Sequence, residues 1–476
     1  TVSLTRAAIT IPTAYTELWN GRIGYIDCDT FGGETEAHFA EGMETYGELA
    51  QRWIVDLRGN GGGVVDAAMG AAGVFTGRGL LAYLKDSDGS FQAYGSNDSA
   101  LTDKPVVVLT DGDTASASEL FASDIRDTRS GLLVGGRTFG KGVAQLVLDG
   151  TSLPGFFDDG DAIKITTYRF YAPNGTTTDT VGLFPHLMVD PALAGEVAVL
   201  LSSSAPVETS EGYLCLSFED AGYWYVSLSE ASAPEYVDAL TALLEAVPNT
   251  VRLQVGMAGG WADMSPGEVA ELCGLTGYRD RSFTDTADSP YANAIDLLAT
   301  YGVLSGGGDG TFRPTGTLTR AELCAMLAQA LNCRVPAGES QFSDVSLEDW
   351  YGICVNAVAR LGLVEGVGDG RFDPDGLVTH EQLITIMARV ARKLNMAMEL
   401  SAPAEGELES GAFLPYASWA RESAWLLSEH RQGSEGGAPS LLWAGLEEIQ
   451  PAGPATREEA AALTCSLLTY LGILPS

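Results

Sequence analysis

The chain has 476 residues, with 27 Lys and Arg against 63 Asp and Glu and a formal net charge of −36. A charge this negative excludes nucleic acid and anionic membrane surfaces as partners, because both would be repelled. No apolar run reaches the roughly 18 residues that a membrane-spanning helix needs, so we expect no membrane span.

The first part of the chain, residues 1–204, alternates short β-type runs with helical stretches. This alternation is typical of an α/β core. We expect strands at 53–57, 105–110 and 143–148, and a helix that begins near Glu119. The chain length suggests about three domains in all.

The second part, residues 205–281, predicts a small α/β module whose role the sequence does not indicate. It follows a serine-rich linker at 202–206. We expect strands at 213–218, 223–228 and 251–255, and helices near 234–247 and 266–274.

The third part of the chain repeats itself. The segment Gly308–Pro314, which contains Gly-Asp-Gly, recurs as Gly368–Pro374 at an offset of 60 residues. A period of this size indicates stacked structural units. We place the three repeats at 282–340, 341–400 and 412–476.

The third repeat is degraded. It keeps Trp419 and the Thr-Arg-Glu-Glu stretch at 456–459. It lacks the Gly-Asp-Gly segment and carries an insertion around 432–450.

Three stretches of the first part carry residues suited to hydrolysis. Ser116 (in Thr-Ala-Ser-Ala-Ser-Glu) and Lys141 (in Thr-Phe-Gly-Lys-Gly) stand 25 positions apart, and the glycine-rich strand end Asp56–Gly63 lies upstream. Amide hydrolysis needs a nucleophile, a base and donors for the oxyanion, and these stretches offer one of each. A lysine base is simpler than a Ser-His-Asp triad, because no histidine lies in them. The four histidines are His38, His186, His380 and His430.

A lysine base must be desolvated, because a solvated lysine is almost fully protonated near neutral pH. Lys141 lies between two glycines and precedes the expected strand at 143–148, so we expect a turn that directs it beside an apolar wall. Ser116 stands at the start of a helix, whose N-terminal amides and dipole favour an oxyanion.

Each stretch also has a common structural explanation. A serine at a helix start is usually an N-cap, and Gly-Lys-Gly is usually an exposed turn. Residues 135–142 nearly match a phosphate-binding loop, but Gly142 follows the lysine and a strand comes next, which argues against nucleotide binding.

The order of these motifs resembles the C-terminal processing peptidases, also called tail-specific proteases. The match runs from Asp56-Leu-Arg-Gly-Asn-x-Gly-Gly through Ser-Ala-Ser-Glu and Thr-Phe-Gly-Lys-Gly-x-x-Gln to Lys164–Gly175, and it covers residues 1–192. The resemblance implies a serine endopeptidase with a Ser/Lys dyad. The implied roles are Ser116 as nucleophile, Lys141 as general base, Gln145 as the residue that orients the lysine, Asp127 in support, and the Gly62 and Ala117 amides as the oxyanion hole.

The chain departs from the pattern of that family in three places. The usual Gly-Asn-Pro-Gly-Gly is Gly-Asn-Gly-Gly-Gly at 59–63, a more flexible turn. Where the family tends to show Gly-Ile-x-Pro-Asp, this chain has Gly-Leu-Phe-Pro-His at 182–186. Such enzymes commonly carry a PDZ domain before the core, whereas residues 2–6 resemble the stretch after it. We therefore expect that this module is missing upstream.

The repeats resemble S-layer homology repeats, of which three in tandem are usual. That family is all-α and forms a pseudo-trimer whose grooves hold the pyruvylated secondary polysaccharide of Gram-positive cell walls. Arg320 and Arg457 fall on the arginine that faces the glycan, and a guanidinium suits a ketal-linked carboxylate. His380 replaces this arginine in the second repeat. The expected glycan-binding set is completed by the opening positions Asp285, Asp344, Trp350 and Trp419.

Several of these residues have an ordinary structural explanation. Large aromatic side chains most often pack in a core, and this applies to Trp350, Trp419, Phe312 and Phe372. The Gly-Asp-Gly segments are most simply turns, since a calcium loop needs further acidic residues at alternate positions. Nothing in the sequence requires a metal or another cofactor. The seven cysteines lack metal-type spacing, and we expect most of them to be small buried residues.

We therefore expect a multidomain chain with an α/β (α+β) Ser/Lys peptidase core, a small α/β module and an all-α S-layer homology pseudo-trimer. The resemblances imply an extracellular serine endopeptidase that cleaves exported proteins or peptides on the cell wall or S-layer surface of a Gram-positive bacterium, held there by secondary cell-wall polysaccharide. One alternative is a catalytically inactive wall-binding surface protein, such as an adhesin or a structural protein associated with the S-layer. Another is an intact peptidase that is autoinhibited without its upstream module.

Overall fold

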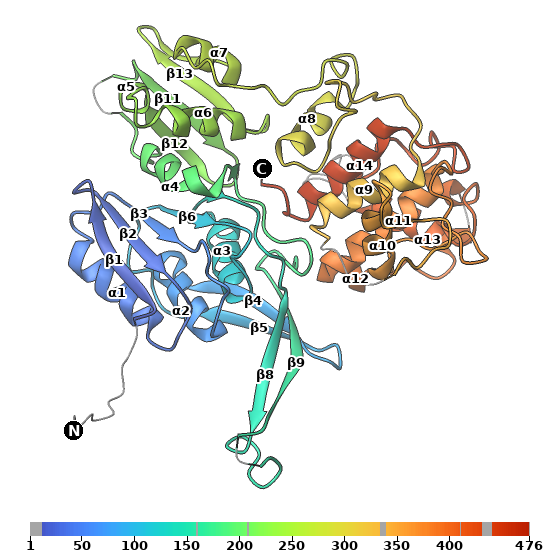
Figure 1. Ribbon diagram of the computed structural model, residues 1–476, viewed down its shortest axis with the longest axis horizontal. Coiled ribbons are helices and arrows are strands. Elements are labelled where there is room, and N and C mark those ends of the chain that lie inside the picture. The colour runs from blue at the N-terminus through green and yellow to red at the C-terminus, as the bar shows by residue number, and fades with distance from the viewer. Residues whose placement is uncertain are drawn as a thin grey trace.

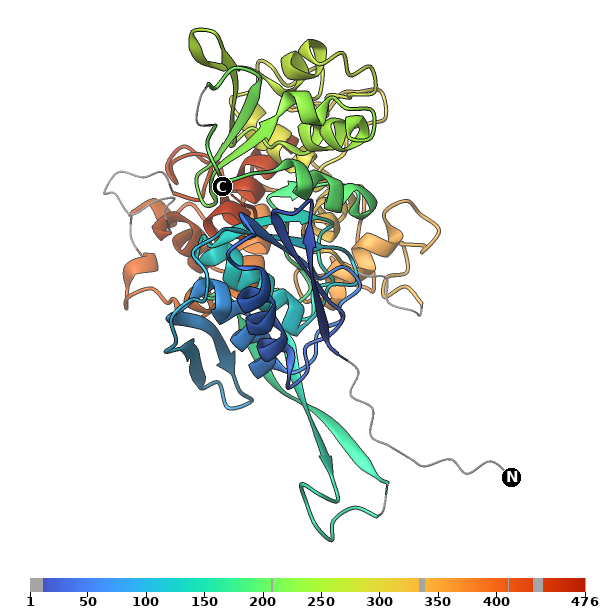
Figure 2. The same ribbon diagram turned by 90° about the vertical axis from the view of Figure 1, so that its left-hand side faces the viewer.

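Three regions of secondary structure follow one another along the chain in the computed structural model (Figure 1). The structure describes residues 12–158, 160–206, 209–333, 339–409, 411–430 and 440–475. The opening residues 2–6 and the first part of the expected insertion at 432–450 lie outside the described residues. In Figure 2 the small module lies above the first region, and the helical unit lies behind both.

The first region is built on a six-stranded sheet in the order β1-β2-β3-β6-β7-β10. Strand β1 pairs antiparallel with β2, and all the other neighbours pair parallel. The expected strands at 53–57 and 105–110 are confirmed, with small shifts at their ends. The strands are β1 Ala14–Trp19, β2 Ile23–Cys28, β3 Arg52–Asp56, β6 Val106–Thr110, β7 Gly131–Gly135 and β10 Leu187–Met188.

Helices cover both faces of this sheet, which explains why its inner strands are continuous apolar runs. Val55 and Val108 pack in a cluster with three helices. These helices are α1 Thr35–Tyr46, α2 Val65–Thr76 and α3 Ala117–Asp127. Ile54 and Val107 pack in the cluster of the opposite face, which holds helix α4 Pro191–Leu200.

The three loops that carry the candidate motifs follow adjacent parallel strands. Strand β3 leads into the glycine-rich stretch, β6 into the serine loop and β7 into the lysine loop. The carboxyl ends of parallel strands meet at one edge of a sheet. The topology therefore brings together segments that are far apart in the sequence.

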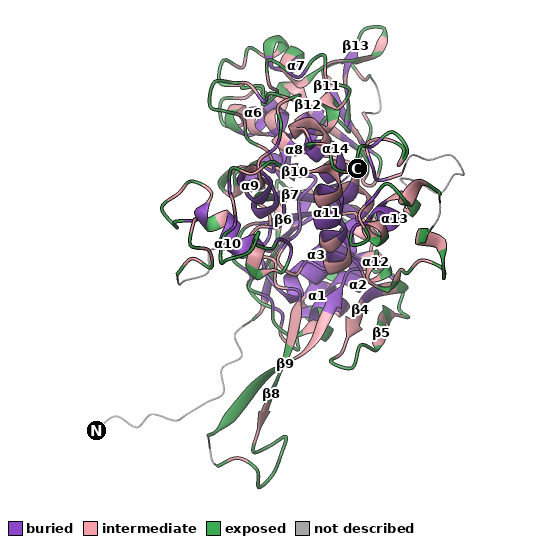
Figure 3. Cartoon of the chain, turned by 90° about the vertical axis from the view of Figure 1, so that its right-hand side faces the viewer, coloured by how far each residue is buried: buried purple, intermediate pink, exposed green. Residues whose placement is uncertain are grey.

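A second sheet, in the order β5-β4-β9-β8, extends the first region. Its strands are β4 Gly79–Lys85, β5 Phe91–Ser96, β8 Val143–Asp149 and β9 Ala162–Tyr171. The β8–β9 hairpin projects from the body of the molecule (Figure 1), and its outer part is exposed (Figure 3). The expected strand at 143–148 is confirmed, but it belongs to this hairpin. Residues 145–147 of β8 are exposed, so they do not form part of the apolar wall that we expect beside Lys141.

The small module is a four-stranded sheet in the order β12-β11-β13-β14 with helices on one side. The expected strands and helices are confirmed, and β14 and α5 were not expected. Residues of helix α6 share a buried cluster with α4 and the six-stranded sheet, so the module packs onto α4. Its elements are β11 Tyr213–Phe218, β12 Gly222–Ser227, α5 Leu228–Ala231, α6 Val237–Ala246, β13 Arg252–Met257, β14 Gly260–Asp263 and α7 Pro266–Leu272.

The last region is helical, and we call helices α8–α14 the helical unit. Backbone hydrogen bonds close a three-membered cycle at its centre: Leu318 N donates to Ala455 O at 2.9 Å, Val378 N to Leu318 O at 3.0 Å, and Ala455 N to Val378 O at 2.8 Å. The three repeats therefore meet around one axis. The helices are α8 Ala292–Thr300, α9 Arg320–Ala330, α10 Gly352–Arg360, α11 His380–Leu394, α12 Met396–Leu400, α13 Arg421–Glu429 and α14 Arg457–Tyr470.

The helical unit packs directly against the first region. Val181 and Phe184 of the first region belong to the same buried cluster as the repeats. The ring of Phe184 meets that of Tyr301 with centroids 5.6 Å apart. No helix among the described residues is long and apolar enough to cross a membrane.

Candidate active site

Ser116 lies in a sharp turn between strand β6 and helix α3. Its φ is 61°, a left-handed value that is uncommon for a serine. Only 8% of its surface is exposed. Strained backbone of this kind is concentrated at functional sites. Ala117 begins the helix, and its N–H has no acceptor among the described residues, so this amide is available to an oxyanion.

The buried carboxylate of Glu119 joins the serine loop to the lysine loop. Its Oε2 accepts the backbone N–H of Ser116 and that of Lys141, each at 2.8 Å. Its Oε1 accepts the N–H of Gly140 at 2.8 Å and the hydroxyl of Thr138 at 2.6 Å. Burial raises the pKa of Glu119, and these four donors oppose the shift. The backbones of the serine and the lysine therefore lie against the same carboxylate oxygen.

Lys141 is half-buried at the start of the β8–β9 hairpin. Although the chain carries a net charge of −36, the amine of Lys141 makes no ion pair or hydrogen bond with any described residue. A carboxylate partner would favour the charged amine, which cannot accept a proton. The surroundings of this lysine are therefore compatible with a general base.

The glycine-rich loop packs on the serine turn through Gly62. A β-carbon at Gly62 would lie 2.8 Å from Ser116 Cβ and 3.0 Å from Ala117 N, so only glycine fits here. The N–H of Gly62 donates to the side-chain oxygen of Asn60 at 2.9 Å. The Gly62 amide, which we expect in the oxyanion hole, therefore already has an acceptor in Asn60 in this structure.

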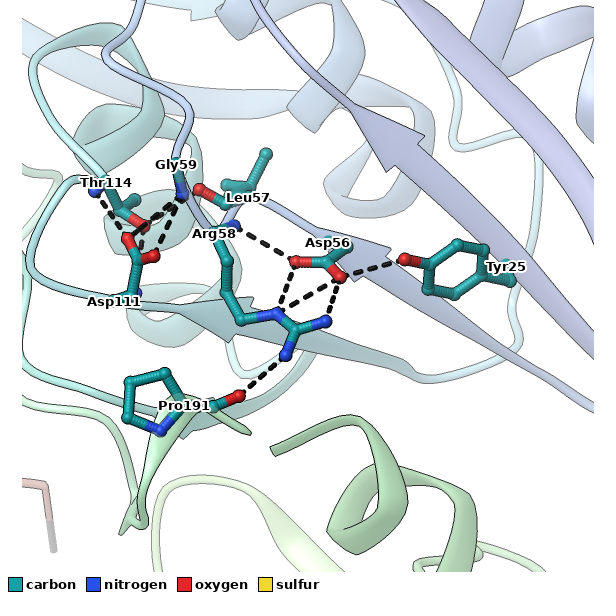
Figure 4. Close-up of polar contacts among 8 residues, drawn as sticks. All are labelled: Tyr25, Asp56, Leu57, Arg58, Gly59, Asp111, Thr114 and Pro191. Atoms are coloured by element: carbon teal, nitrogen blue, oxygen red, sulfur yellow. Dashed lines mark hydrogen bonds and ion pairs between the residues drawn. The ribbon is translucent and has the colours of Figure 1, made fainter. Parts of the chain in front are cut away.

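Carboxylates at the strand ends hold the glycine and serine loops together (Figure 4). Asp111 accepts the N–H of Gly59 at 3.0 Å and that of Thr114 at 2.9 Å. Asp56 accepts hydrogen bonds from Nε of Arg58 at 2.9 Å and from the hydroxyl of Tyr25 at 2.8 Å. Arg58 extends this network to the start of α4 by donating to Pro191 O at 2.6 Å.

The two supporting residues of the expected site lie apart from Ser116. Gln145 is exposed on β8 and donates to the Thr166 hydroxyl at 3.2 Å, so its side chain does not contact Lys141 in this structure. Asp127 ends helix α3, about 15 Å along the helix from Ser116. It pairs with Arg126 Nε at 2.8 Å. Asp127 is therefore too distant for a direct part in proton transfer.

The two expected glycan-binding arginines, and the histidine that replaces the arginine in the second repeat, occupy equivalent positions in the three repeats. Arg320, His380 and Arg457 are the first residues of α9, α11 and α14, each after a threonine cap. Arg457 Nη1 pairs with Glu322 at 2.9 Å, and His380 Nε2 lies 3.1 Å from Glu459. Arg457 and His380 are therefore each paired with a glutamate of a neighbouring repeat.

Arg320 differs from the other two. Its guanidinium donates to the carbonyls of Phe372 at 2.9 Å and Glu365 at 2.6 Å, and it has no carboxylate partner among the described residues. Gln382 stands at the third position of α11, where α9 and α14 carry the pairing glutamates. Arg320 is therefore the one of the three that makes no ion pair with a described residue, although Asp373 and Asp344 lie near enough to stabilise its charge.

Asp285 and Asp344, which we expect in the glycan-binding set, contact backbone amides in this structure. Asp285 accepts the backbone N–H of Phe312 and Arg313, each at 2.8 Å. Asp344 accepts that of Phe372 at 2.7 Å and that of Asp373 at 2.9 Å. These carboxylates cap the Gly-Asp-Gly turns, and as anions they would repel an anionic glycan.

The four aromatic residues of the repeats divide into two kinds. Phe312 and Phe372 are buried, as expected of core residues. Trp350 and Trp419 are 68% and 54% exposed, so core packing is wrong for the two tryptophans. Trp350 lines a cavity of about 370 Å³ that Arg457 also borders.

Sequence reasoning missed three residues that shape the site: Glu119, Asn60 and Asp111. Glu119 was detectable, because Ser-x-x-Glu before an apolar run is the signature of a capping box. The other two act through turns whose partners are distant in sequence. Among the described residues, no group of three or more His, Cys, Asp or Glu side chains is placed to hold a metal ion.

Comparisons with known proteins agree with both resemblances. Residues 22–189 match the family model of peptidase family S41, and residues 282–324 and 341–384 match that of the S-layer homology domain. The third expected repeat, at 412–476, lies outside the matched residues.

The chain is 32% identical over 229 residues to the chloroplastic C-terminal processing peptidase of Tetradesmus obliquus, covering 43% of this chain and 47% of that protein. It is 31% identical over 193 residues to the carboxyl-terminal-processing protease of Picosynechococcus sp., covering 40% of this chain and 45% of that protein. A similar solved structure is the photosystem II D1 C-terminal processing protease, with 29% identity, 40% of this chain and 51% of that chain covered, and a TM-score of 0.34. The chain spans about half the length of the curated relatives it matches. It carries a peptidase family S41 domain followed by S-layer homology domains.

Proposed function

We propose that the chain is a serine endopeptidase in which Ser116 is the nucleophile and Lys141 is the general base. The observation that carries this proposal is the carboxylate of Glu119, whose Oε2 accepts the N–H of both residues at 2.8 Å. A shared acceptor fixes the two backbones side by side, as a proton-transfer pair requires. The match to peptidase family S41 covers both residues.

The proposed reaction uses groups of adjacent loops. The neutral amine of Lys141 takes the hydroxyl proton of Ser116 as Oγ attacks the scissile carbonyl. The Ala117 N–H and the N-terminal end of α3 stabilise the oxyanion. The Gly62 N–H becomes a second donor when it leaves Asn60, so substrate binding competes with that contact. The ammonium of Lys141 then protonates the leaving amine as the C–N bond breaks, which leaves an acyl-enzyme on Ser116 and a neutral lysine. Water hydrolyses this acyl-enzyme, with the lysine again as base.

Cleavage of unfolded casein by the purified chain tests this proposal, with fragments followed by gel electrophoresis. Ser116→Ala should abolish cleavage. Ser118→Ala, a change at a buried serine two residues away, is the matched control and should leave cleavage intact. Equal cleavage by wild type and Ser116→Ala would contradict the proposal. Absence of cleavage by the wild type would instead favour the inactive wall-binding protein, which the occupied Gly62 amide also supports.

We further propose that the helical unit binds an anionic secondary cell-wall polysaccharide, and that Arg320 is its main contact. The S-layer homology matches support wall binding, and the missing carboxylate partner of Arg320 supports an anionic ligand at that position. Long-range repulsion from a chain of charge −36 is screened beyond about 8 Å at physiological salt, so a local contact can dominate. The peptidase would then act outside a Gram-positive cell, on exported proteins or peptides.

Co-sedimentation of the full chain with Gram-positive walls tests this second proposal. Arg320→Ala should weaken binding by about 1.5–3 kcal/mol, the range for a hydrogen bond to a charged group. Arg313→Ala removes the same charge from an arginine that is paired with Asp309, and it should bind as wild type. Equal binding to walls with and without the pyruvyl ketal would contradict the proposal.

A further inference from the structure

The loop between β7 and β8, residues 136–142, is held from two sides. On one side, Glu119 of the first region accepts the Thr138 hydroxyl and the backbone N–H groups of Gly140 and Lys141. On the other side the loop touches the helical unit. The same short segment therefore contacts both the serine turn and the repeats.

Arg137 anchors the start of this loop on the end of helix α9. Its Nη1 donates to Gln329 O at 2.7 Å and its Nη2 to Ala330 O at 2.5 Å, and these are the last two residues of the helix. A cation suits this place, because the final carbonyls of a helix lack intrahelical donors and carry the negative end of its dipole. The guanidinium also lies 3.8 Å from the ring centre of Phe184 and donates to Val181 O at 2.7 Å.

Asn332, just beyond the same helix, holds the middle of the loop. Its side-chain NH₂ donates to the carbonyls of Thr138 at 3.2 Å and Phe139 at 3.3 Å. Thr138 therefore faces Glu119 with its hydroxyl and Asn332 with its carbonyl. Asn332 has a φ of 50°, a left-handed conformation that asparagine tolerates better than most residues.

The loop is not packed tightly against the second repeat, so the hydrogen bonds of Arg137 and Asn332 are its main contacts with the helical unit. A cavity of about 300 Å³ lies between the loop and the second repeat, bordered by Phe139, Gly140, Asn332, Cys333 and Arg360. Gly140 has a φ of 90°, so the backbone next to Lys141 is intrinsically permissive. Where a glycine loop borders a cavity, its position depends on its hydrogen bonds.

We propose that Arg137 and Asn332 are positioning residues for Lys141. The C-terminal end of helix α9, in the first repeat, would then hold the lysine loop in the position that the peptidase reaction needs. This inference rests on the proposed function, in which Lys141 is the base. Its consequence is that the repeats set the rate of the chemical step as well as the location of the enzyme.

The experiment compares variants of the full chain. Asn332→Gly removes both hydrogen bonds and accepts the left-handed backbone without strain. Asn332→Asp places a carboxylate against the carbonyl oxygens of Thr138 and Phe139, which repel it. This variant should therefore displace the loop more than Asn332→Gly does. Glu399→Gln is the control. It removes the negative charge from an ion pair between the helical unit and Lys85 of the first region, with a 2.5 Å N–O distance, and this ion pair does not involve the loop.

Two measurements are made on each variant. For Asn332→Gly, kcat on casein should fall about 10- to 100-fold while KM stays within about two-fold. Amide hydrogen exchange at Gly140 and Lys141 should accelerate by about ten-fold or more. Glu399→Gln should change neither. Arg137→Lys, which keeps the charge but loses the fork of donors, is a second variant and should shift both readouts in the same direction.

Wild-type exchange in Asn332→Gly and Arg137→Lys would overturn the inference, and so would faster exchange with an unchanged kcat. A wild-type chain that does not cleave casein would refute the proposed function. The exchange measurement still decides, independently of activity, whether the repeats hold the loop.

Discussion

The change Glu119→Gln probes the contact on which the proposed site depends. The carboxylate accepts from four donors, two at each oxygen. Glutamine keeps one oxygen and places an NH₂ group where the other oxygen stood. Two of the four donors therefore lose their acceptor. Each charge-assisted bond contributes about 1.5–3 kcal/mol, which gives a gross loss of about 3–6 kcal/mol. The neutral side chain avoids the cost of burying a charge, so we expect a net loss near the lower end.

Urea unfolding of the full chain, followed by circular dichroism, measures this loss, and casein cleavage measures its effect on the rate. Both should fall in Glu119→Gln, because the Ser116 and Lys141 amides no longer share an acceptor. Thr138→Ser is the control, since it keeps the hydroxyl that donates to Glu119. The change to glutamine alters charge and hydrogen bonding but hardly alters volume. Wild-type stability and rate in this variant would refute the idea that Glu119 joins the two loops.

Three further predictions concern separate parts of the molecule. Gln382→Glu should supply the carboxylate that Arg320 lacks and weaken co-sedimentation with walls by about 1 kcal/mol or more; wild-type binding would show that the free charge of Arg320 is not the contact. Burial lowers the pKa of His186 from 6.5 to about 4. The contribution of the neutral histidine to the free energy of unfolding is therefore complete above pH 6.5, and about 3 kcal/mol of it is lost as the pH falls towards 4. Urea unfolding at pH 7 and pH 5 should show about 2 kcal/mol of this fall, and His186→Gln should flatten it. Gly62→Ala should abolish casein cleavage, since its β-carbon would lie 2.8 Å from Ser116 Cβ at a φ of 103°, and retained cleavage would argue against the close packing of the two loops.

Local patterns predicted most of the fold and the elements that carry the candidate residues. The apolar runs at 53–57 and 105–110 are strands because both of their faces are covered by helices. The repeats were visible because Gly-Asp-Gly turns recur at a fixed spacing. Their capping aspartates, Asp285 and Asp344, were assigned to glycan, since a sequence does not show which backbone amides a carboxylate will meet.

The parts that the sequence did not predict depend on contacts between distant segments. The bond from Gly62 N to Asn60 and the exposure of Trp350 depend on how the loops and repeats meet in space. Gln145 shares β8 with residues that project into solvent, which its local sequence does not indicate. The docking of Arg137 on the end of α9 joins segments that are almost 200 residues apart.

The kinetics of Ser116→Ala, Lys141→Ala and the double variant test the central claim most directly. If the two residues form one proton-transfer unit, each single change should remove nearly all of kcat/KM on casein, and the double change should cost little more. All three chains should stay folded, because the amine of Lys141 makes no ion pair or hydrogen bond with a described residue. Loss of the Ser116 side chain from the capping box of α3 should lower stability by about 1 kcal/mol at most. Turnover by Lys141→Ala within about ten-fold of the wild type, or additive losses in the double variant, would contradict the account.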